Sequence, residues 1–206
     1  MEKFQEEIDI PKCIGDQRRI GITGGIASGK STIGSYLEKI KNLPILDADV
    51  FSREALKPGT NAYHSVIQRY KTGVLKNKLI DRKVLSKIIF NDANERLWLE
   101  SLIHPIIYNK FSEAIQCHQQ SKILIMIVPL LLEANFTDLC TEVWVVNCSK
   151  EQQLKRLITR DSLNKDEAIK KIEAQWPLEK KIKFANFVID NSSESNVWKE
   201  QIDNLI

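Results

Sequence analysis

The most constraining feature of the sequence is a glycine-rich stretch that follows a short apolar run. The chain has 8 glycines in 206 residues, and Gly24, Gly25 and Gly29 fall close together. Residues 24–31 read GGIASGKS and match the pattern G-x-x-x-x-G-K-[ST] without a gap. A β-strand is expected before the stretch and a helix from about Lys30, which is the context that a phosphate-binding loop (P-loop) requires. The alternative is a tight turn that matches the pattern by chance.

Each part of this P-loop has a physical role in holding a nucleoside triphosphate. Small residues let successive backbone N–H groups turn inward toward phosphate oxygens, and the following helix adds its partial positive charge. The Lys30 ammonium is expected to reach the β- and γ-phosphates, and the Ser31 hydroxyl to be a ligand of Mg²⁺. The residues of this stretch expected to contact ATP are Gly25, Ile26, Ala27, Ser28, Gly29, Lys30, Ser31 and Thr32.

Short β-branched runs alternate with helical patterns, which is typical of an α/β protein with a parallel sheet flanked by helices. Two of the runs are almost continuously apolar, as strands buried on both faces are. N-cap signals predict helices after Ser149, with Gln152 reaching back, and after Asn164, with Glu167. The five expected strands are 18–23, 43–47, 122–128, 142–147 and 186–189.

Residues 59–118, between the second and third of these strands, show helical spacing of apolar residues and no good strand pattern. The segment is too long for one crossover helix. We therefore expect a helical insertion that stands off the sheet.

Two acids follow the second strand, in the sequence ILDAD. Asp47 and Asp49 would lie at the carboxyl edge of a parallel sheet, where α/β folds bind their ligands. A carboxylate beside the γ-phosphate can accept a proton from an incoming hydroxyl or hold Mg²⁺ through water. The alternative for either acid is to cap the next helix.

Two arginines in the segment QLKRLITRD are spaced one helical turn apart, so Arg156 and Arg160 would share a helix face. On a mobile segment above the phosphates they would neutralise the charge that develops during transfer and complete the site by closing over it. Taken alone, such a pair is more often a solvated helix face.

Composition and processing signals narrow the class of protein. The formal net charge of +3 is too small to argue for nucleic-acid binding by itself. The longest apolar run, 123–132, is broken by Pro129, and the acidic first residues are unlike a signal or transit peptide. We expect a cytoplasmic protein without a membrane or nucleic-acid partner, with residues 1–17 as a loosely held extension. Its four cysteines are expected to be reduced thiols: Cys13, Cys117, Cys140 and Cys148.

From about residue 20 to residue 191 the sequence resembles the dephospho-coenzyme A kinases, a family of P-loop kinases. The resemblance is carried by GITGGIASGKST, ILDAD with REAL after it, LIDRKVLSKIIF, LWLESLIHP, IVPLLLE, VWVVNCSKEQQLKRLITRD and FANFVIDN. It implies a P-loop NTPase-type fold and transfer of the ATP γ-phosphoryl group to the ribose 3′-hydroxyl of dephospho-coenzyme A, with Mg²⁺ as cofactor. It also implies one kinase domain (18–206), made of a core (18–58 and 119–206), an acceptor-binding insertion (about 59–118) and a lid (about 156–176).

The resemblance also implies roles for individual residues. The implied catalytic residues are Asp49 as the base, Lys30 and Arg156; the further ATP contacts are Arg160 and Asn191; the acceptor-side residues are Asp47, Arg82 and His104. For Arg82 the alternative is a surface ion pair. For His104, which precedes Pro105, the alternative is that the pair fixes a helix start or a turn.

The sequence departs from the family pattern at several positions. Ala27 stands where family members commonly have glycine, and we expect its methyl group to be tolerated if its φ is negative. Ser192 and Ser193 follow VIDN in place of a glycine-containing turn. The third strand, in contrast, agrees with the family: it ends at Pro129 without a Walker-B acid, which shifts metal binding to Ser31, water and the two acids.

Two other functions remain open on the sequence alone. One is another P-loop nucleotide or small-molecule kinase on the same scaffold. The other is a nucleotide-hydrolysing switch or nucleic-acid-binding protein, for which the lysine-rich segment 170–184 is the nearest candidate surface. That segment alternates lysines with glutamates, and we interpret it as a solvated amphipathic helix.

Overall fold

The computed structural model describes residues 17–193 and 196–206. Its centre is a parallel sheet with the strand order β2-β5-β1-β6-β7. The strands are β1 (Arg18–Gly24), β2 (Ile45–Asp47), β5 (Ile123–Ile127), β6 (Glu142–Asn147) and β7 (Phe187–Asp190). All five strands expected from the sequence are thus confirmed, with ends that differ by one or two residues.

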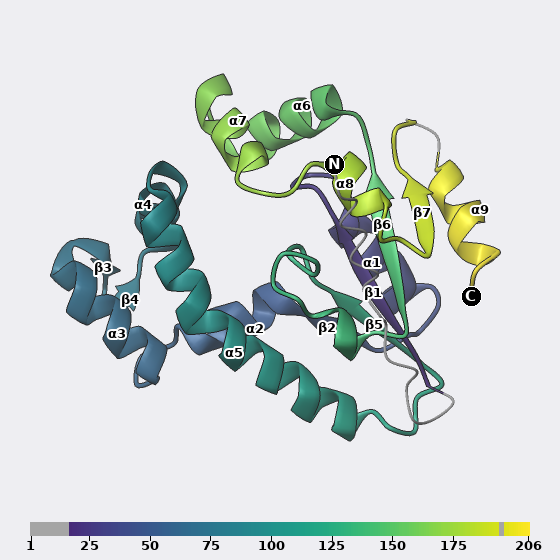
Figure 1. The fold of residues 1–206 in the computed structure, drawn as a ribbon, viewed down its shortest axis with the longest axis horizontal. Coiled ribbons are helices and arrows are strands. Elements are labelled where there is room, and N and C mark those ends of the chain that lie inside the picture. Colours follow the sequence, from purple (N-terminus) through teal and green to yellow (C-terminus); the bar gives the residue numbers. More distant parts are fainter. Residues whose placement is uncertain (1–16, 194–195) are drawn as a thin grey trace, which may run out of the picture.

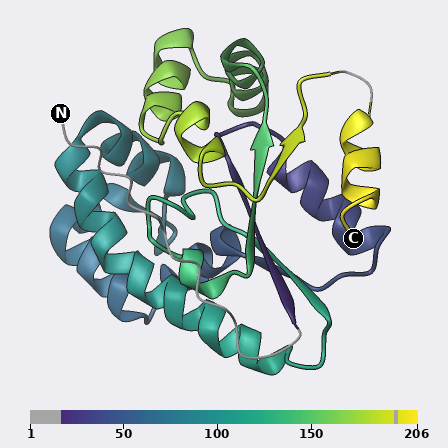
Figure 2. The ribbon, with the colours of Figure 1, turned by 45° about the vertical axis from the view of Figure 1, so that its right-hand side comes forward.

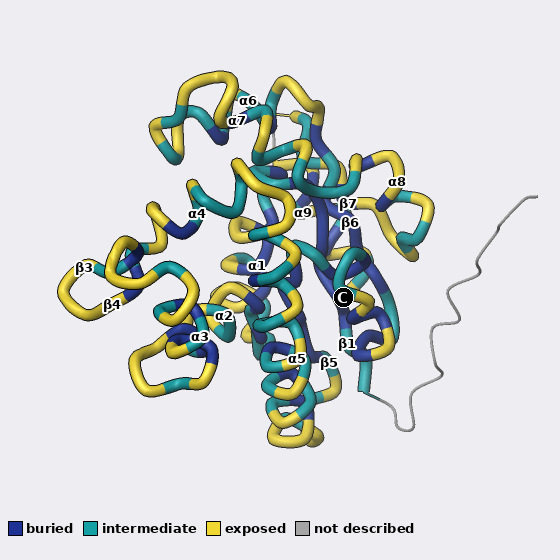
Figure 3. Tube along the Cα trace, turned by 60° about the vertical axis from the view of Figure 1, so that its left-hand side comes forward, coloured by how far each residue is buried: buried dark blue, intermediate teal, exposed yellow. Residues whose placement is uncertain are grey.

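Helices cover both faces of this sheet. Because side chains alternate along a strand, Leu124 and Met126 of β5 pack in a cluster with α5 (Ala93–Cys117). Ile125 and Ile127 pack in a second cluster, with α1 (Lys30–Lys39) and α9 (Val197–Asp203). Figure 2 shows α5 on one side of the sheet and α1 and α9 on the other. The three inner strands β5, β1 and β6 are largely buried between these layers (Figure 3), which explains their apolar runs, whereas the edge strand β7 is mostly exposed.

The segment between β2 and β5 is mainly helical, with its own small core. It comprises α2 (Ala48–Ala55), α3 (Asn61–Tyr70), a 3₁₀ turn η1 (Lys71–Val74), β3 (Leu75–Lys76), β4 (Leu79–Ile80), α4 (Arg82–Asn91) and α5. Figure 1 shows α3, α4 and the β3–β4 hairpin standing away from the sheet. The second half of α5 does not stand off: Phe111 and Ile115 belong to the cluster on the sheet.

The β3–β4 hairpin contradicts the expectation of a segment without strands. Each strand has two residues, too few for a recognisable pattern, and Leu75 pairs with Ile80. Asn77 and Lys78 connect them with φ values of 52° and 62°. Positive φ at both central residues is the geometry of a tight two-residue hairpin turn.

Helix α5 also corrects the alternative for His104 and Pro105. They lie inside this helix, which begins after Asp92, where the carboxylate accepts hydrogen bonds from the backbone N–H groups of Asn94 and Glu95. The pair therefore fixes neither a helix start nor a turn.

After β6 the chain forms α6 (Lys150–Asp161), α7 (Lys165–Glu173) and α8 (Leu178–Ile182). Ser149 with Gln152 and Asn164 with Glu167 form the expected capping boxes. The segment 170–184 is not one solvated helix, because it breaks between α7 and α8 and contains Lys181, whose side chain is 0% exposed. A short 3₁₀ turn, η2 (Thr137–Leu139), precedes β6.

The remaining expectations concern the ends and thiols of the chain. Cys117, Cys140 and Cys148 are free thiols, whereas Cys13 and residues 1–16 of the expected extension lie outside the described residues. Gln17 is bound to the main fold, since its Nε2 donates to the carbonyl oxygens of His118 (2.7 Å) and Ser121 (2.8 Å). In the described part of the chain, no helix has the length and apolar character needed to cross a membrane.

Candidate active site

The P-loop joins β1 to α1, as expected. Gly29 is the N-cap of α1, with φ 108°, and the helix begins at Lys30. The Lys30 Nζ donates hydrogen bonds to the carbonyl oxygens of Gly24 (3.1 Å) and Gly25 (2.8 Å). Burial, and then the positive charge of Lys181, lower the pKa of Lys30 to about 7. The amine that would bind phosphate is therefore held by the carbonyl groups of the loop itself.

Ala27 has a backbone conformation that is unfavourable for alanine. Its φ is 58°, in the left-handed region, where an alanine is strained because its Cβ approaches the following carbonyl oxygen. The condition of a negative φ, under which we expected the methyl group to be tolerated, is therefore not met. The position still has the shape that a glycine would adopt most easily.

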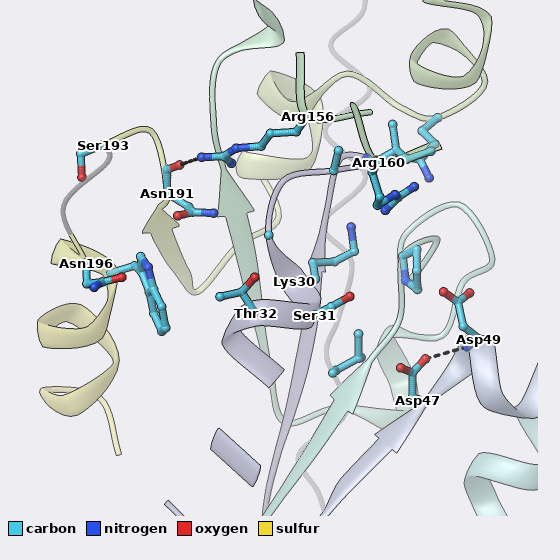
Figure 4. A pocket seen from close by; sticks show the side chains of 17 residues that line it. Lys30, Ser31, Thr32, Asp47, Asp49, Arg156, Arg160, Asn191, Ser193 and Asn196 are labelled. Atoms are coloured by element: carbon cyan, nitrogen blue, oxygen red, sulfur yellow. Dashed lines mark hydrogen bonds between the residues drawn. The ribbon is translucent and has the colours of Figure 1, made fainter. Parts of the chain in front are cut away.

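A cavity of about 760 Å³ opens above the P-loop and α1. It brings together eleven of the residues expected from the sequence (Figure 4): Ile26, Ala27, Gly29, Lys30, Ser31, Thr32, Asp47, Asp49, Arg156, Arg160 and Asn191. Gly25, Ser28, Arg82 and His104 do not line it. Ser28 is fully buried, and Gly25 lines a separate cavity of about 360 Å³ on the other side of the loop.

The two acids have different environments. Asp47 is the N-cap of α2, and its Oδ1 accepts a hydrogen bond from the backbone N–H of Asp49 at 2.7 Å. It is half-buried, and this burial raises its pKa. Asp49 is exposed to the cavity, and its charge interacts with Lys30, Arg82 and Arg160. The capping alternative thus holds for Asp47, although Asp47 also lines the cavity.

A second cavity, of about 270 Å³, adjoins the first. It lies between α2, α4, α5 and the loop after β5, and apolar side chains such as Leu99, Ile103 and Ile107 form much of its wall. The two cavities share three lining residues: Asp49, Pro129 and Gln175. Asp49 is therefore the carboxylate at the border between them.

His104 lines this second cavity, whereas Arg82 lines neither. The His104 ring stands edge-on to Phe136, with 5.8 Å between ring centroids, and its burial lowers its pKa. Arg82 is exposed in the first turn of α4, and within the described residues it forms no ion pair at contact distance. The surface ion pair considered for Arg82 is thus not formed there.

Two side chains connect the P-loop to α6. The Asn191 Nδ2 donates to the carbonyl oxygen of Ser28 (2.8 Å), and the Arg156 Nη2 donates to the carbonyl oxygen of Asn191 (3.0 Å). Arg160, one turn further along α6, pairs with Asp161 at 2.7 Å. Both arginines line the cavity, but Arg156 is half-buried whereas the Arg160 side chain is 57% exposed, so the solvated-face alternative is excluded only for Arg156.

Four polar side chains that support the site were not predicted from the sequence. Gln153 and Gln175 hydrogen-bond to the backbone of Ile26, and Lys181 forms an ion pair with Glu133 at 2.9 Å. The Lys181 Nζ also donates to the carbonyl oxygen of Pro129. The only available signal was Glu133, a single acid closing the apolar run VPLLL.

The strand order and the cavity above the P-loop are those of a P-loop kinase. This fold defines the class of protein to which the chain belongs. The solved shikimate kinase from Bacteroides thetaiotaomicron has the same fold, with a TM-score of 0.55 over 91% of this chain and 97% of that one, at 15% identity. A sequence model of the family described as dephospho-CoA kinase matches residues 18–196. The chain belongs to the dephospho-CoA kinase family.

Individual relatives agree with this assignment. A dephospho-CoA kinase of the cyanobacterium Prochlorococcus marinus is 49% identical, over 93% of this chain and 94% of the relative. That of Synechococcus sp. (strain CC9605) is 47% identical, over 92% of each chain. The solved dephospho-CoA kinase from Campylobacter jejuni is 27% identical with a TM-score of 0.63, over 91% of this chain and 94% of that one.

Proposed function

We propose that the chain transfers the γ-phosphoryl group of ATP to the ribose 3′-hydroxyl of dephospho-coenzyme A, forming coenzyme A and ADP. It is an ATP-dependent kinase that acts on a hydroxyl group, as its family is. The observation that carries the mechanism is the position of Asp49 on the border between the two cavities. A base at this border can reach a hydroxyl that enters from one cavity while the phosphates occupy the other.

The larger cavity would hold ATP. Phosphate oxygens would be bound by the backbone N–H groups of the P-loop, and Lys30 would leave the Gly24 and Gly25 carbonyl oxygens for the β- and γ-phosphates. Arg156 and Arg160 would neutralise the charge on the transferred group. The adenine end would lie toward Asn191, because the cavity continues there to Ser193, Asn196 and Trp198.

The second cavity would hold the acceptor against α5, with His104 in its wall. We place Arg82 near the anionic part of the acceptor, because its guanidinium is exposed and forms no ion pair among the described residues. Residues 59–118 would then be the acceptor-binding insertion and α6–α7 the lid. Asp47 would support the same edge by fixing the turn that presents Asp49.

The residues present fit a magnesium ion that is bound mainly by phosphates. Ser31 offers an exposed hydroxyl, and Asp47 offers a carboxylate in the same cavity; oxygen is the ligand that Mg²⁺ prefers. In the described part of the chain, no group of three His, Cys, Asp or Glu side chains forms a metal cage. Held beside Ser31 and Asp47, the ion would supply positive charge that offsets the negative charge of the phosphates. We place the activity in the cytoplasm, without a nucleic-acid or membrane partner.

The proposal is tested by the choice of acceptor. Purified protein with Mg²⁺-ATP is incubated with dephospho-coenzyme A, with nucleoside monophosphates and with shikimate, and ADP release is followed. We expect rapid release only with dephospho-coenzyme A. Phosphorylation of a nucleoside monophosphate or shikimate, with dephospho-coenzyme A inert, would overturn the proposal in favour of another P-loop kinase.

A further inference from the structure

One residue of the P-loop is held on both its backbone polar groups by glutamine side chains. The backbone N–H of Ile26 donates to the Gln175 Oε1 at 2.7 Å. The Gln153 Nε2 donates to the carbonyl oxygen of Ile26 at 2.8 Å. Gln153 lies in the first part of α6, and Gln175 lies two residues after the end of α7. Both ends of the α6–α7 pair therefore meet on one residue of the phosphate-binding loop.

The contact with Gln153 requires that residue 25 of the loop has no side chain. Gln153 is 5% exposed, and a Cβ atom on Gly25 would overlap its Nε2. A Cβ atom on Gly29 would overlap the Nδ2 of Asn191 in the same way. These two glycines thus leave room for carboxamide side chains to pack directly against the loop, Gln153 at Gly25 and Asn191 at Gly29.

The position of Gln175 is held by hydrogen bonds of the residue that follows it. The backbone N–H of the next residue, Trp176, donates to the Glu133 Oε1 at 3.0 Å. The same oxygen accepts the Lys181 Nζ, which also donates to the carbonyl oxygen of Pro129. Because Pro129 closely follows the apolar end of β5, Gln175 is attached to the sheet as well as to the loop. Gln175 also lines both the larger and the second cavity.

We infer that Gln153 and Gln175 are positioning residues, which couple the conformation of the P-loop to the placement of Arg156 over the transferred phosphoryl group. This inference rests on the proposed function. Arg156 follows Gln153 by three residues and therefore lies on the same side of α6. A movement of the Ile26 backbone on phosphate binding is passed to α6 through Gln153 and to the end of α7 through Gln175. A second connection, through Asn191 and Ser28, joins Arg156 to the same loop.

The test replaces each amide by an apolar side chain of similar length, in Gln153→Met and Gln175→Met. Since displacing a charge-neutralising group by about 1 Å costs up to about 100-fold in rate, we expect kcat to fall by about 10- to 100-fold. We expect KM for ATP to stay within about three-fold, because the phosphate-binding N–H groups remain. Lys155→Met, at an exposed position of α6, is the matched control and should stay within about two-fold of the parent in kcat.

Double variants distinguish a positioning role of the glutamines from a general loss of structure. In an Arg156→Met background, each glutamine substitution should cost less than about two-fold in kcat, because the group that it positions is gone. An equal loss of kcat in both backgrounds, or single variants with unchanged kcat, would overturn the inference. An Arg156→Met variant with unchanged kcat would also overturn the inference, because Arg156 would then not act on the transferred group. The proposed function is tested separately, since it fails only if the parent does not phosphorylate dephospho-coenzyme A.

Discussion

The Asp47 carboxylate accepts the backbone N–H of Asp49 at 2.7 Å, so one acid fixes the turn that presents the other. Asp47 is thereby held against the N-terminus of α2. The Asp49 carboxylate makes no hydrogen bond within residues 17–193 and 196–206, and its charge faces Lys30 and Arg160 across the cavity. Two acids that look equivalent in the sequence thus have different environments, and the free carboxylate of Asp49 is the one that we propose as the base.

Replacing Asp49 with Asn should separate catalysis from nucleotide binding. A positioned base contributes about 10²- to 10⁴-fold, so we expect kcat to fall by at least about 100-fold. ATP affinity, measured by calorimetry, should change by less than about three-fold, because the P-loop is intact. A variant with turnover within a few-fold of the parent would show that Asp49 is not the base. Asp92→Asn, at the N-cap of α5 and outside both cavities, is the matched control, because an asparagine side chain also caps a helix.

Binding of ATP should take up a proton above pH 7. Burial and Lys181 lower the pKa of Lys30 to about 7, so at pH 8 the free protein holds this amine mostly neutral. Phosphate oxygens favour the ammonium and raise its pKa, so binding adds close to one proton at pH 8. Near pH 6 the amine is already charged and the uptake should vanish. Calorimetric titrations in buffers of different ionisation enthalpy measure this quantity.

Lys30→Met is the control for that titration. It removes the titrating amine, so proton uptake at pH 8 should be lost together with much of the ATP affinity. Equal uptake in the variant and the parent would assign the proton to another group.

Ala27→Gly should stabilise the fold. The left-handed φ of 58° costs an alanine about 1–2 kcal/mol. Glycine removes this cost but has about 0.5–1 kcal/mol more conformational entropy to lose on folding. We therefore expect a gain of up to about 1.5 kcal/mol in the free energy of unfolding, measured by urea denaturation. A loss of stability would show that the alanine methyl group makes a favourable contact that outweighs the strain.

Replacing only one partner of the buried ion pair between Lys181 and Glu133 should strongly destabilise the protein. Their side chains are 0% and 15% exposed, with 2.9 Å between Nζ and Oε1. Lys181→Met leaves a buried carboxylate unpaired, and Glu133→Gln leaves a buried ammonium unpaired. Each should lower the free energy of unfolding, measured by urea denaturation, by about 3–5 kcal/mol.

The double variant Lys181→Met/Glu133→Gln distinguishes a charge effect from a packing effect. Because neither charge remains, it should be more stable than the sum of the two single losses predicts. Strict additivity would mean that the pair does not interact in the folded protein.

Local chemistry explains what could be predicted from the sequence. The P-loop, the five strands and the two capping boxes depend on neighbouring residues, so their patterns are visible in the sequence, and all were confirmed. The placement of Asp47, Asp49, Arg156 and Arg160 around one cavity also followed, because the carboxyl edge of a parallel sheet gathers such residues.

Tertiary contacts explain what could not be predicted. Gln153 and Gln175 are ordinary residues in helical segments, and their contacts with Ile26 arise only when α6 and the end of α7 fold back on the loop. Lys181 looked like one more lysine on a solvated helix, because nothing nearby in the sequence marks Glu133 as its partner. The sign of φ at Ala27 was left open, because it depends on the turn of the folded loop and an alanine in the sequence does not reveal it.

The proposed transfer to the 3′-hydroxyl of dephospho-coenzyme A is tested most directly by identifying the product. Protein, Mg²⁺-ATP and dephospho-coenzyme A are incubated, and the new phosphorus signal is correlated with ribose protons by ³¹P–¹H NMR. We expect the parent to form a product whose new phosphorus couples to the ribose H3′. This product should be almost absent with Asp49→Asn over the same time. A phosphate on any other hydroxyl, or no phosphorylated product from the folded parent, would contradict the proposed transfer.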